Sequence, residues 1–202
     1  MKNYAIYYSY RGMGDVLVII FNNSLSVTSN KTINNVTVVY HDEEVIGYNI
    51  FNIKDIVKIK SEGLIYYPSE TFLNIINSIL TNAKLETLEK KDNSGYFILE
   101  AKELQPIEKE KTLVTLMFSK KMINAIIKNQ PLKIGDKVVV ALAGTYLNDG
   151  EVVKEDKYES TLLNGHICTN KELGIKENEE ELLILEEEAK TGEDFFLVEE
   201  HL

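Results

Sequence analysis

The apolar positions in the first third of the chain fall in short runs that are typical of β-strands. Residues 4–8 and 16–21 are rich in β-branched and aromatic side chains, and the two glycines of 11–15 between them suit a turn. Residues 36–40 and 45–51 form a second such pair across a polar turn. The pattern therefore predicts two β-hairpins.

The pattern changes to a helical period after Pro68. Ser69 is a good N-cap residue, and apolar residues recur every three or four positions from Phe72 to Ala83. This predicts a helix over 69–83 whose apolar stripe covers the predicted strands. The polar run that follows predicts a domain boundary, which divides the chain into 1–94 and 95–202.

The second half begins with runs that predict further strands over 96–104, 111–118 and 136–142. Between the last two, Ser119 precedes a segment that predicts a short helix over 120–128, which Pro131 prevents from continuing. In this helix Met122, Ala125 and Ile126 would cover the neighbouring strands.

Turn signals complete the pattern of the second half. The tripeptide 148–150, Asn-Asp-Gly, predicts a hairpin turn. Residues 169–172 have the form of a capping box and Gly174 suits a helix end, which predicts a single helical turn. Residues 182–185 predict a short strand between acidic flanks. The predicted fold is an α+β N-terminal domain followed by an all-β, OB-fold barrel with short helices.

Charge is distributed unevenly between the two predicted domains. The whole chain has a net charge of -10, of which residues 1–94 contribute -1 and residues 95–202 contribute -9. The acidic C-terminal segment 176–202 alone carries -9, so residues 95–175 are neutral. A basic face on the second domain is therefore compatible with the overall acidity.

The residue inventory argues against an enzyme. The sequence has 3 histidines and 1 cysteine, without the spacing of a metal site or of a nucleophile with its base. We expect no cofactor and no metal, and interpret Cys168 as a small buried apolar residue. The single cysteine, the lack of a long apolar run and the lack of a signal-peptide pattern favour a cytoplasmic protein without a membrane partner.

Several segments together carry a resemblance to known proteins. The second half resembles the tRNA-binding domain shared by endothelial-monocyte-activating-polypeptide-like proteins, phenylalanyl-tRNA synthetase β subunits and some methionyl-tRNA synthetases. The first half is similar to the short domain of YtpR-type bacterial proteins. The matching residues are Gly135-Asp-Lys-Val-Val-Val-Ala-Leu142, Gly144, Asn164-Gly165, Ile167-Cys168 and Lys171-Glu-Leu-Gly174 in the second half, and Gly12-Met-Gly-Asp-Val-Leu17 and Gly47-Tyr-Asn-Ile-Phe-Asn52 in the first.

The resemblance implies an OB-fold barrel that binds tRNA through shape and backbone, often as a homodimer, without chemistry of its own. The lysines nearest the matched motifs are then candidates for backbone contacts: Lys137, Lys154, Lys157 and Lys171. Asn164 and His166 are candidates for contact with a base or sugar, although a turn and a strand position explain them equally well. Lys121 and Lys128, two turns apart on one face of the predicted helix, are further candidates, with ordinary surface lysines as the alternative.

Departures from the family pattern affect the expected RNA affinity. Glu159 stands where the family has an arginine, and Leu163 stands where it has a serine. A carboxylate repels the phosphate that an arginine would bind, so we expect weakened tRNA binding. Two functions therefore stay open: a non-catalytic tRNA-binding accessory protein, or a protein-interaction module derived from a tRNA-binding domain that no longer binds RNA.

Overall fold

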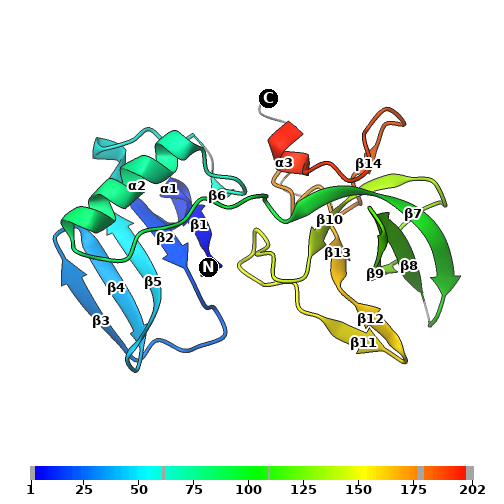
Figure 1. The fold of residues 1–202 in the computed structure, drawn as a ribbon, viewed down its shortest axis with the longest axis horizontal. Coiled ribbons are helices and arrows are strands. Elements are labelled where there is room, and N and C mark those ends of the chain that lie inside the picture. The colour runs from blue at the N-terminus through cyan, green and yellow to red at the C-terminus, as the bar shows by residue number, and fades with distance from the viewer. Residues whose placement is uncertain (1–2, 61, 109, 177–179, 199–202) are drawn as a thin grey trace. The chain divides into compact units, whose positions relative to one another are not determined.

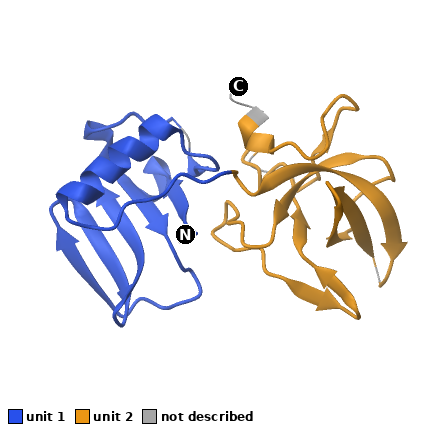
Figure 2. Ribbon diagram, viewed as in Figure 1, with its two compact units in different colours: residues 1–92 blue, residues 93–202 orange. Residues whose placement is uncertain are grey.

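The computed structural model describes residues 3–60, 62–108, 110–176 and 180–198. The chain divides into two compact units, Met1–Asp92 and Asn93–Leu202, which are blue and orange in Figure 2. We call them unit 1 and unit 2 and describe each by itself. No helix of the described ranges is both long enough and apolar enough to cross a bilayer.

Unit 1 is an antiparallel sheet of six strands with one long helix, α2 (Glu70–Asn82), on one face (Figure 1). The strand order is β3-β4-β5-β2-β1-β6, so neighbours in the chain mostly pair with each other. Both predicted hairpins are present, as β1–β2 and β4–β5. The strands are β1 (Ala5–Tyr8), β2 (Val16–Ile20), β3 (Ser29–Ile33), β4 (Val36–His41), β5 (Glu44–Phe51) and β6 (Gly63–Leu64).

The helix α2 forms where the helical period predicted it. The Ser69 hydroxyl oxygen accepts a hydrogen bond from the Phe72 backbone N–H at 3.2 Å, which satisfies one amide of the first turn. Leu73, Ile76 and Leu80 are buried against the apolar face of the sheet. Burying each of these side chains contributes about 1.5–3 kcal/mol, so packing rather than helix propensity holds α2 in place.

The connection between β1 and β2 is more structured than the predicted turn. It contains one turn of helix, α1 (Tyr10–Met13), whose N-cap Ser9 accepts a hydrogen bond from the Gly12 N–H. Gly14 then has φ 79°, a conformation that residues with a Cβ rarely adopt, and the chain reverses into β2. This geometry leaves the side chains of α1 at the surface, because none of its residues is buried.

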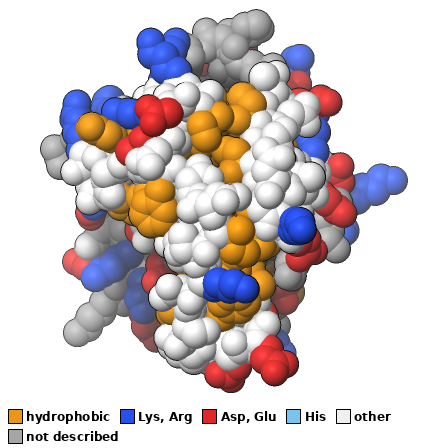
Figure 3. All heavy atoms as spheres, turned by 90° about the vertical axis from the view of Figure 1, so that its left-hand side faces the viewer, with side chains coloured by type: hydrophobic (Ala, Val, Ile, Leu, Met, Phe, Trp, Pro, Cys, Tyr) orange, Lys and Arg blue, Asp and Glu red, His pale blue; other side chains and the backbone are white. Residues whose placement is uncertain are grey.

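Apolar side chains also reach the surface of unit 1. Figure 3 views the left-hand side of Figure 1 and shows them in a broken band among uncharged groups, with charged side chains mostly around the margin. The large apolar residues of unit 1 that are described as exposed are Tyr10, Met13, Val27, Phe51 and Ile56.

Unit 2 is built on five strands in the order β13-β10-β7-β8-β9, in which each pair of neighbouring strands is antiparallel. The shorter β14 also pairs with β10, and β11 and β12 form a separate hairpin. The strands are β7 (Tyr96–Pro106), β8 (Lys111–Phe118), β9 (Lys121–Lys128), β10 (Lys137–Leu142), β11 (Asp156–Tyr158), β12 (Thr161–Leu163), β13 (Gly165–Ile167) and β14 (Ile184–Leu185).

Two asparagines connect the ends of this sheet and close it into a barrel. The Asn164 N–H donates to the Asn124 carbonyl oxygen at 3.1 Å, and the Asn124 N–H donates to the Asn164 side-chain oxygen at 2.9 Å. Asn124 lies on β9 and Asn164 directly precedes β13. The predicted fold class, an α+β unit followed by an all-β barrel of the OB type, is confirmed.

The predicted helix over 120–128, which carried Lys121 and Lys128, is wrong. The segment is the strand β9, which pairs with β8 along its whole length. Its buried residues Ile123, Ala125 and Ile127 alternate with period two, whereas Met122 is 58% exposed. The β-branched residues and the tight turn at Ser119, which has φ 56°, favour a hairpin once β8 is beside them.

Three further predicted features of unit 2 are confirmed. Gly150 has φ 91° in the hairpin turn after Leu147, whose N–H donates to Glu151. At the capping box, the Glu172 N–H donates to the Thr169 hydroxyl at 3.2 Å. The Leu173 N–H donates to the Thr169 carbonyl and closes a single helical turn. Of the predicted strand over 182–185, residues 184 and 185 form β14, and Leu182 makes an isolated bridge with Thr169. A short helix, α3 (Phe195–Val198), packs beside β7.

Candidate functional site

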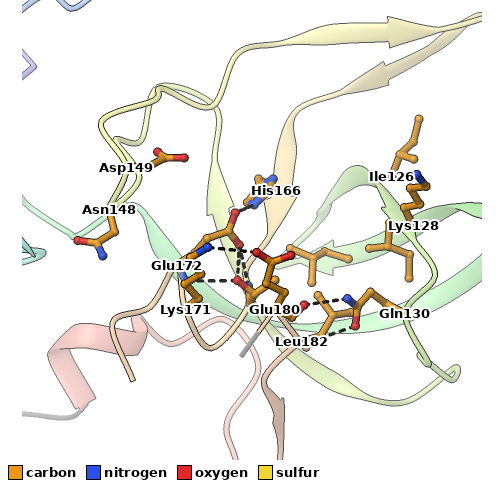
Figure 4. Close-up of a pocket in the computed structure, with 13 residues that line it drawn as sticks. Ile126, Lys128, Gln130, Asn148, Asp149, His166, Lys171, Glu172, Glu180 and Leu182 are labelled. Atoms are coloured by element: carbon orange, nitrogen blue, oxygen red, sulfur yellow. Dashed lines mark hydrogen bonds and ion pairs between the residues drawn. The ribbon is translucent and has the colours of Figure 1, made fainter. Parts of the chain in front are cut away.

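A pocket with a volume of about 590 Å³ opens on the surface of unit 2 and brings together three of the eight predicted site residues. These are Lys128 at the end of β9, His166 on β13 and Lys171 in the capping-box turn. Figure 4 shows Asn148 and Asp149 at one end of the pocket and Lys128 at the other. Its apolar wall consists of Ile126, Ile127, Ile167 and Leu182.

The histidine of the pocket belongs to a hydrogen-bonded network around one carboxylate. His166 Nε2 lies 2.8 Å from Glu172 Oε1, and the second oxygen, Oε2, accepts from the Thr169 N–H at 2.8 Å and from the Thr169 hydroxyl at 3.0 Å. Burial alone would raise the pKa of the Glu172 carboxyl, but the hydrogen bonds from His166 and Thr169 outweigh burial and lower it. Glu172 thereby fixes both the imidazole ring and the turn that carries Lys171.

A second carboxylate, that of Glu180, reaches the pocket from the acidic C-terminal segment. Its side chain pairs with the Lys171 ammonium at 3.1 Å, and its backbone carbonyl accepts from Gln130 Nε2 at 2.8 Å. The exposed fractions of the two paired side chains are 54% for Lys171 and 78% for Glu180, so solvent screens the pair. The Lys171 charge is nevertheless already satisfied in this structure.

The Lys128 ammonium differs from its two basic neighbours in the pocket. It is exposed, and no described carboxylate forms an ion pair with it. In the lining as a whole, the number of acidic side chains equals the number of basic ones, because Asp149, Glu172 and Glu180 accompany the three basic residues. The pocket thus combines an apolar wall with one available cation at its rim, a composition that can bind the apolar face of a base or sugar and one phosphate.

The other predicted site residues lie outside this pocket. Lys121 lies at the opposite end of β9 from Lys128, about 23 Å along an extended strand. The Lys137 ammonium donates to the backbone carbonyls of Glu187 and Ala189, so it stabilises the C-terminal segment. Lys154 is exposed, and Lys157 is exposed on β11, close to the turn residue Glu159. Asn164 uses its side-chain oxygen in barrel closure.

The sequence did not identify the acceptors that control this pocket. Glu172 was recognised as part of a capping box, but its contact with His166 requires the turn to fold back beside β13. The sequence pattern places Glu180 in the acidic flank before residues 182–185, and only the folded chain brings it to Lys171. Gln130, which fixes Glu180, has no motif at all.

Cys168 and the metal-ligating residue types of the described ranges form no shared metal site. Cys168 is completely buried, and burial raises the pKa of its thiol far above the usual value. Within the described ranges, no group of three or more histidine, cysteine and acidic side chains is arranged to hold a metal ion.

Comparison with known proteins adds four findings. A family model described as a domain of unknown function (DUF4479) matches residues 23–92. YtpR of Bacillus subtilis (strain 168), whose name assigns it provisionally to tRNA binding, is 27% identical over 201 residues, which cover 94% of this chain and 98% of that protein. The phenylalanine–tRNA ligase beta subunit of Legionella pneumophila (strain Paris) is 36% identical over 76 residues.

The lengths of these matches differ. The ligase match covers 33% of this chain but only 10% of the ligase subunit, so it concerns one segment of a much larger protein. An uncharacterised protein of Mycoplasma pneumoniae is 27% identical over 75% of this chain. The resemblance to YtpR-type proteins with a tRNA-synthetase-like segment, predicted from the motifs, is confirmed.

Proposed function

We propose that this chain is a non-catalytic, cytoplasmic tRNA-binding protein whose barrel contacts the RNA backbone, with Lys128 as the main phosphate contact of the pocket. The observation that carries the proposal is the similarity to YtpR along nearly the whole chain. The pocket supports it, because it combines an apolar wall with Lys128, for which the described residues contain no carboxylate partner. Since its other basic side chains are paired with carboxylates, we expect moderate affinity that falls with salt.

A filter-binding titration of the full chain with total tRNA at several salt concentrations tests this proposal. We expect retention at low salt and a linear loss of log affinity with log salt concentration. Replacing Lys128 with Gln should reduce the magnitude of the slope by about one unit, because one phosphate contact is lost. Lys121→Gln is the matched control, since it removes the same charge from the far end of the same strand. A wild-type chain that retains no tRNA at low salt refutes the proposal.

A protein-interaction module is the second candidate function. Two carboxylates favour it. Glu180 forms an ion pair with the Lys171 ammonium, and Glu159 adds a negative charge near Lys157. In that case a protein partner should co-purify after nuclease treatment while tRNA binding is absent. Loss of the partner on nuclease treatment would argue for RNA instead.

We also propose a homodimer, which the family resemblance suggests. Analytical ultracentrifugation of the full chain over a concentration series distinguishes a dimer from a monomer of 23.0 kDa. A single species of monomer mass at every concentration would contradict the homodimer and leave the RNA-binding proposal intact.

A further inference from the structure

Two loops of unit 1 meet at one end of its sheet and form a surface that we call the unit 1 patch. One loop is the β1–β2 connection with α1, and the other follows β5 and contains the short helix η1 (Ile53–Asp55). Strand pairing brings the two loops together, because Val16, the first residue of β2, pairs with Phe51, the last residue of β5. The patch consists of Tyr10, Arg11, Met13, Phe51, Lys54 and Ile56.

Asp15 holds the two loops in a fixed arrangement. Its backbone carbonyl accepts from the Asn52 N–H at 2.9 Å. Its carboxylate accepts from the Lys54 N–H at 3.1 Å and from the Tyr8 hydroxyl at 3.3 Å. Because these bonds join both loops to the sheet, the patch is preorganised and does not need to order itself when a ligand binds.

The patch concentrates exposed apolar surface. Four of the five large apolar residues described as exposed in unit 1 lie in it, with exposed fractions of 50% for Tyr10, 46% for Met13, 42% for Phe51 and 48% for Ile56. Scattered exposed apolar residues are ordinary. These four instead come from two loops that Asp15 and the pairing of Val16 with Phe51 hold together, and exposed apolar surface that gathers in one region marks an interaction surface. Two aromatic rings are part of this group.

The cations of the patch lack carboxylate partners among the described residues. The Lys54 ammonium lies 3.0 Å from the centroid of the Tyr10 ring, a cation–π contact. Arg11, the only arginine in the sequence, is exposed on α1. Neither side chain forms a described ion pair. The Asp15 carboxylate is directed to Tyr8 and the Lys54 backbone.

We propose that the unit 1 patch binds single-stranded RNA, with bases stacked on Tyr10 and Phe51 and phosphates on Arg11 and Lys54. Exposed aromatic rings beside unpaired cations are the combination that binds unpaired nucleotides, since every base has a π-face and guanidinium groups bind phosphate through two hydrogen bonds. Met13 and Ile56 offer apolar contacts to ribose. The inference extends the proposed tRNA binding to a second surface, which would contact an unpaired segment of the same RNA.

The test measures the affinity of the full chain for a fluorescent ten-residue oligouridylate and, separately, for total tRNA. We expect Tyr10→Ala to weaken oligouridylate binding about tenfold, through loss of one stacking contact. Arg11→Gln should reduce the magnitude of the salt slope by about one unit. Tyr10→Phe retains the ring and should bind like the wild type. Lys31→Gln, an exposed lysine on β3, is the matched charge control and should also bind like the wild type.

The outcomes separate this inference from the proposed function. The proposal that the patch binds RNA is overturned if the wild type does not bind oligouridylate. It is also overturned if Tyr10→Ala and Arg11→Gln bind oligouridylate as well as the wild type does. The apolar surface of the patch would then be assigned to a protein partner. Equal losses in Arg11→Gln and Lys31→Gln also overturn it, because the effect would then be general charge. Patch-dependent oligouridylate binding without any tRNA binding supports the patch while the proposed tRNA function fails.

Discussion

The pocket of unit 2 and the unit 1 patch both contain basic side chains, but they differ in what those side chains contact. In the pocket, His166 and Lys171 pair with Glu172 and Glu180. In the patch, Lys54 lies over an aromatic ring and Arg11 has no described carboxylate partner. A lysine that lies near a family motif is therefore not always available to a phosphate. Availability depends on which acceptors the fold brings to the same place.

The largest effect is expected when the Glu172 carboxylate, the centre of the hydrogen-bonded network in the pocket, is removed. Glu172→Gln loses charge-assisted hydrogen bonds to His166 and Thr169, so we expect the free energy of unfolding to fall by about 1–2 kcal/mol at pH 7. Urea unfolding measures this effect. Glu188→Gln, on an exposed acid of the same unit, is the control and should leave the unfolding free energy unchanged.

The pH dependence of the same variant gives a second comparison. The folded pKa of Glu172 is lowered, so its contribution to stability is fully present above the unfolded pKa of 4.5 and is lost as the pH falls through the folded pKa. Between pH 7 and the acid range, the wild type should therefore lose more stability than Glu172→Gln. Parallel stability curves for the two proteins would show that the network contributes nothing.

A smaller effect is expected when the pairing of Lys171 is released. Glu180→Gln frees the Lys171 ammonium for a phosphate, so tRNA affinity at low salt should rise by about two- to fivefold, the range expected for an exposed ion pair. The gain should shrink above 0.15 M salt, because screening already weakens the pair. Filter binding with Glu188→Gln as control measures it. An unchanged affinity would mean that Glu180 does not compete with RNA.

The smallest effect on RNA binding is expected at Lys137. Its ammonium caps the carbonyls of Glu187 and Ala189, so Lys137→Gln should change tRNA affinity by less than about twofold. The same change should reduce the unfolding free energy by about 0.5–1.5 kcal/mol through the lost hydrogen bonds. Filter binding and urea unfolding of the one variant test both statements. A large loss of tRNA affinity with an unchanged free energy of unfolding would contradict this prediction and would indicate that Lys137 contacts RNA.

The sequence predicted those elements whose local signals agree with each other. The helix α2 has a cap, a period and a buried stripe, and the apolar run of β10 has the length and the β-branched residues of a buried strand. The segment that became β9 fitted two templates, because Met122, Ala125 and Ile126 suit a helix while Ile123, Ala125 and Ile127 suit a strand. Pairing with β8 decided between them, and pairing is not visible in a short apolar run.

The candidate site was predictable only in part for a related reason. Lys128, His166 and Lys171 could be chosen from the motifs and from their charge, and the fold brings them into one pocket. The partners Glu172 and Glu180 could not be recognised, because their role depends on distances created by the folded turn and by the segment at 180–182. The unit 1 patch could not be predicted, because its residues come from two loops that Asp15, the Lys54–Tyr10 contact and strand pairing bring together in the fold.

Hydrogen exchange of the full chain with and without total tRNA, measured at low salt, tests the central claim most directly. We predict that tRNA protects amides of the pocket, around residues 126–130 and 166–172, and leaves the far end of β9 near residue 121 unchanged. Unchanged exchange throughout the pocket at saturating tRNA, or protection confined to the far end of β9, would contradict the claim that this pocket is the RNA-binding site of the barrel.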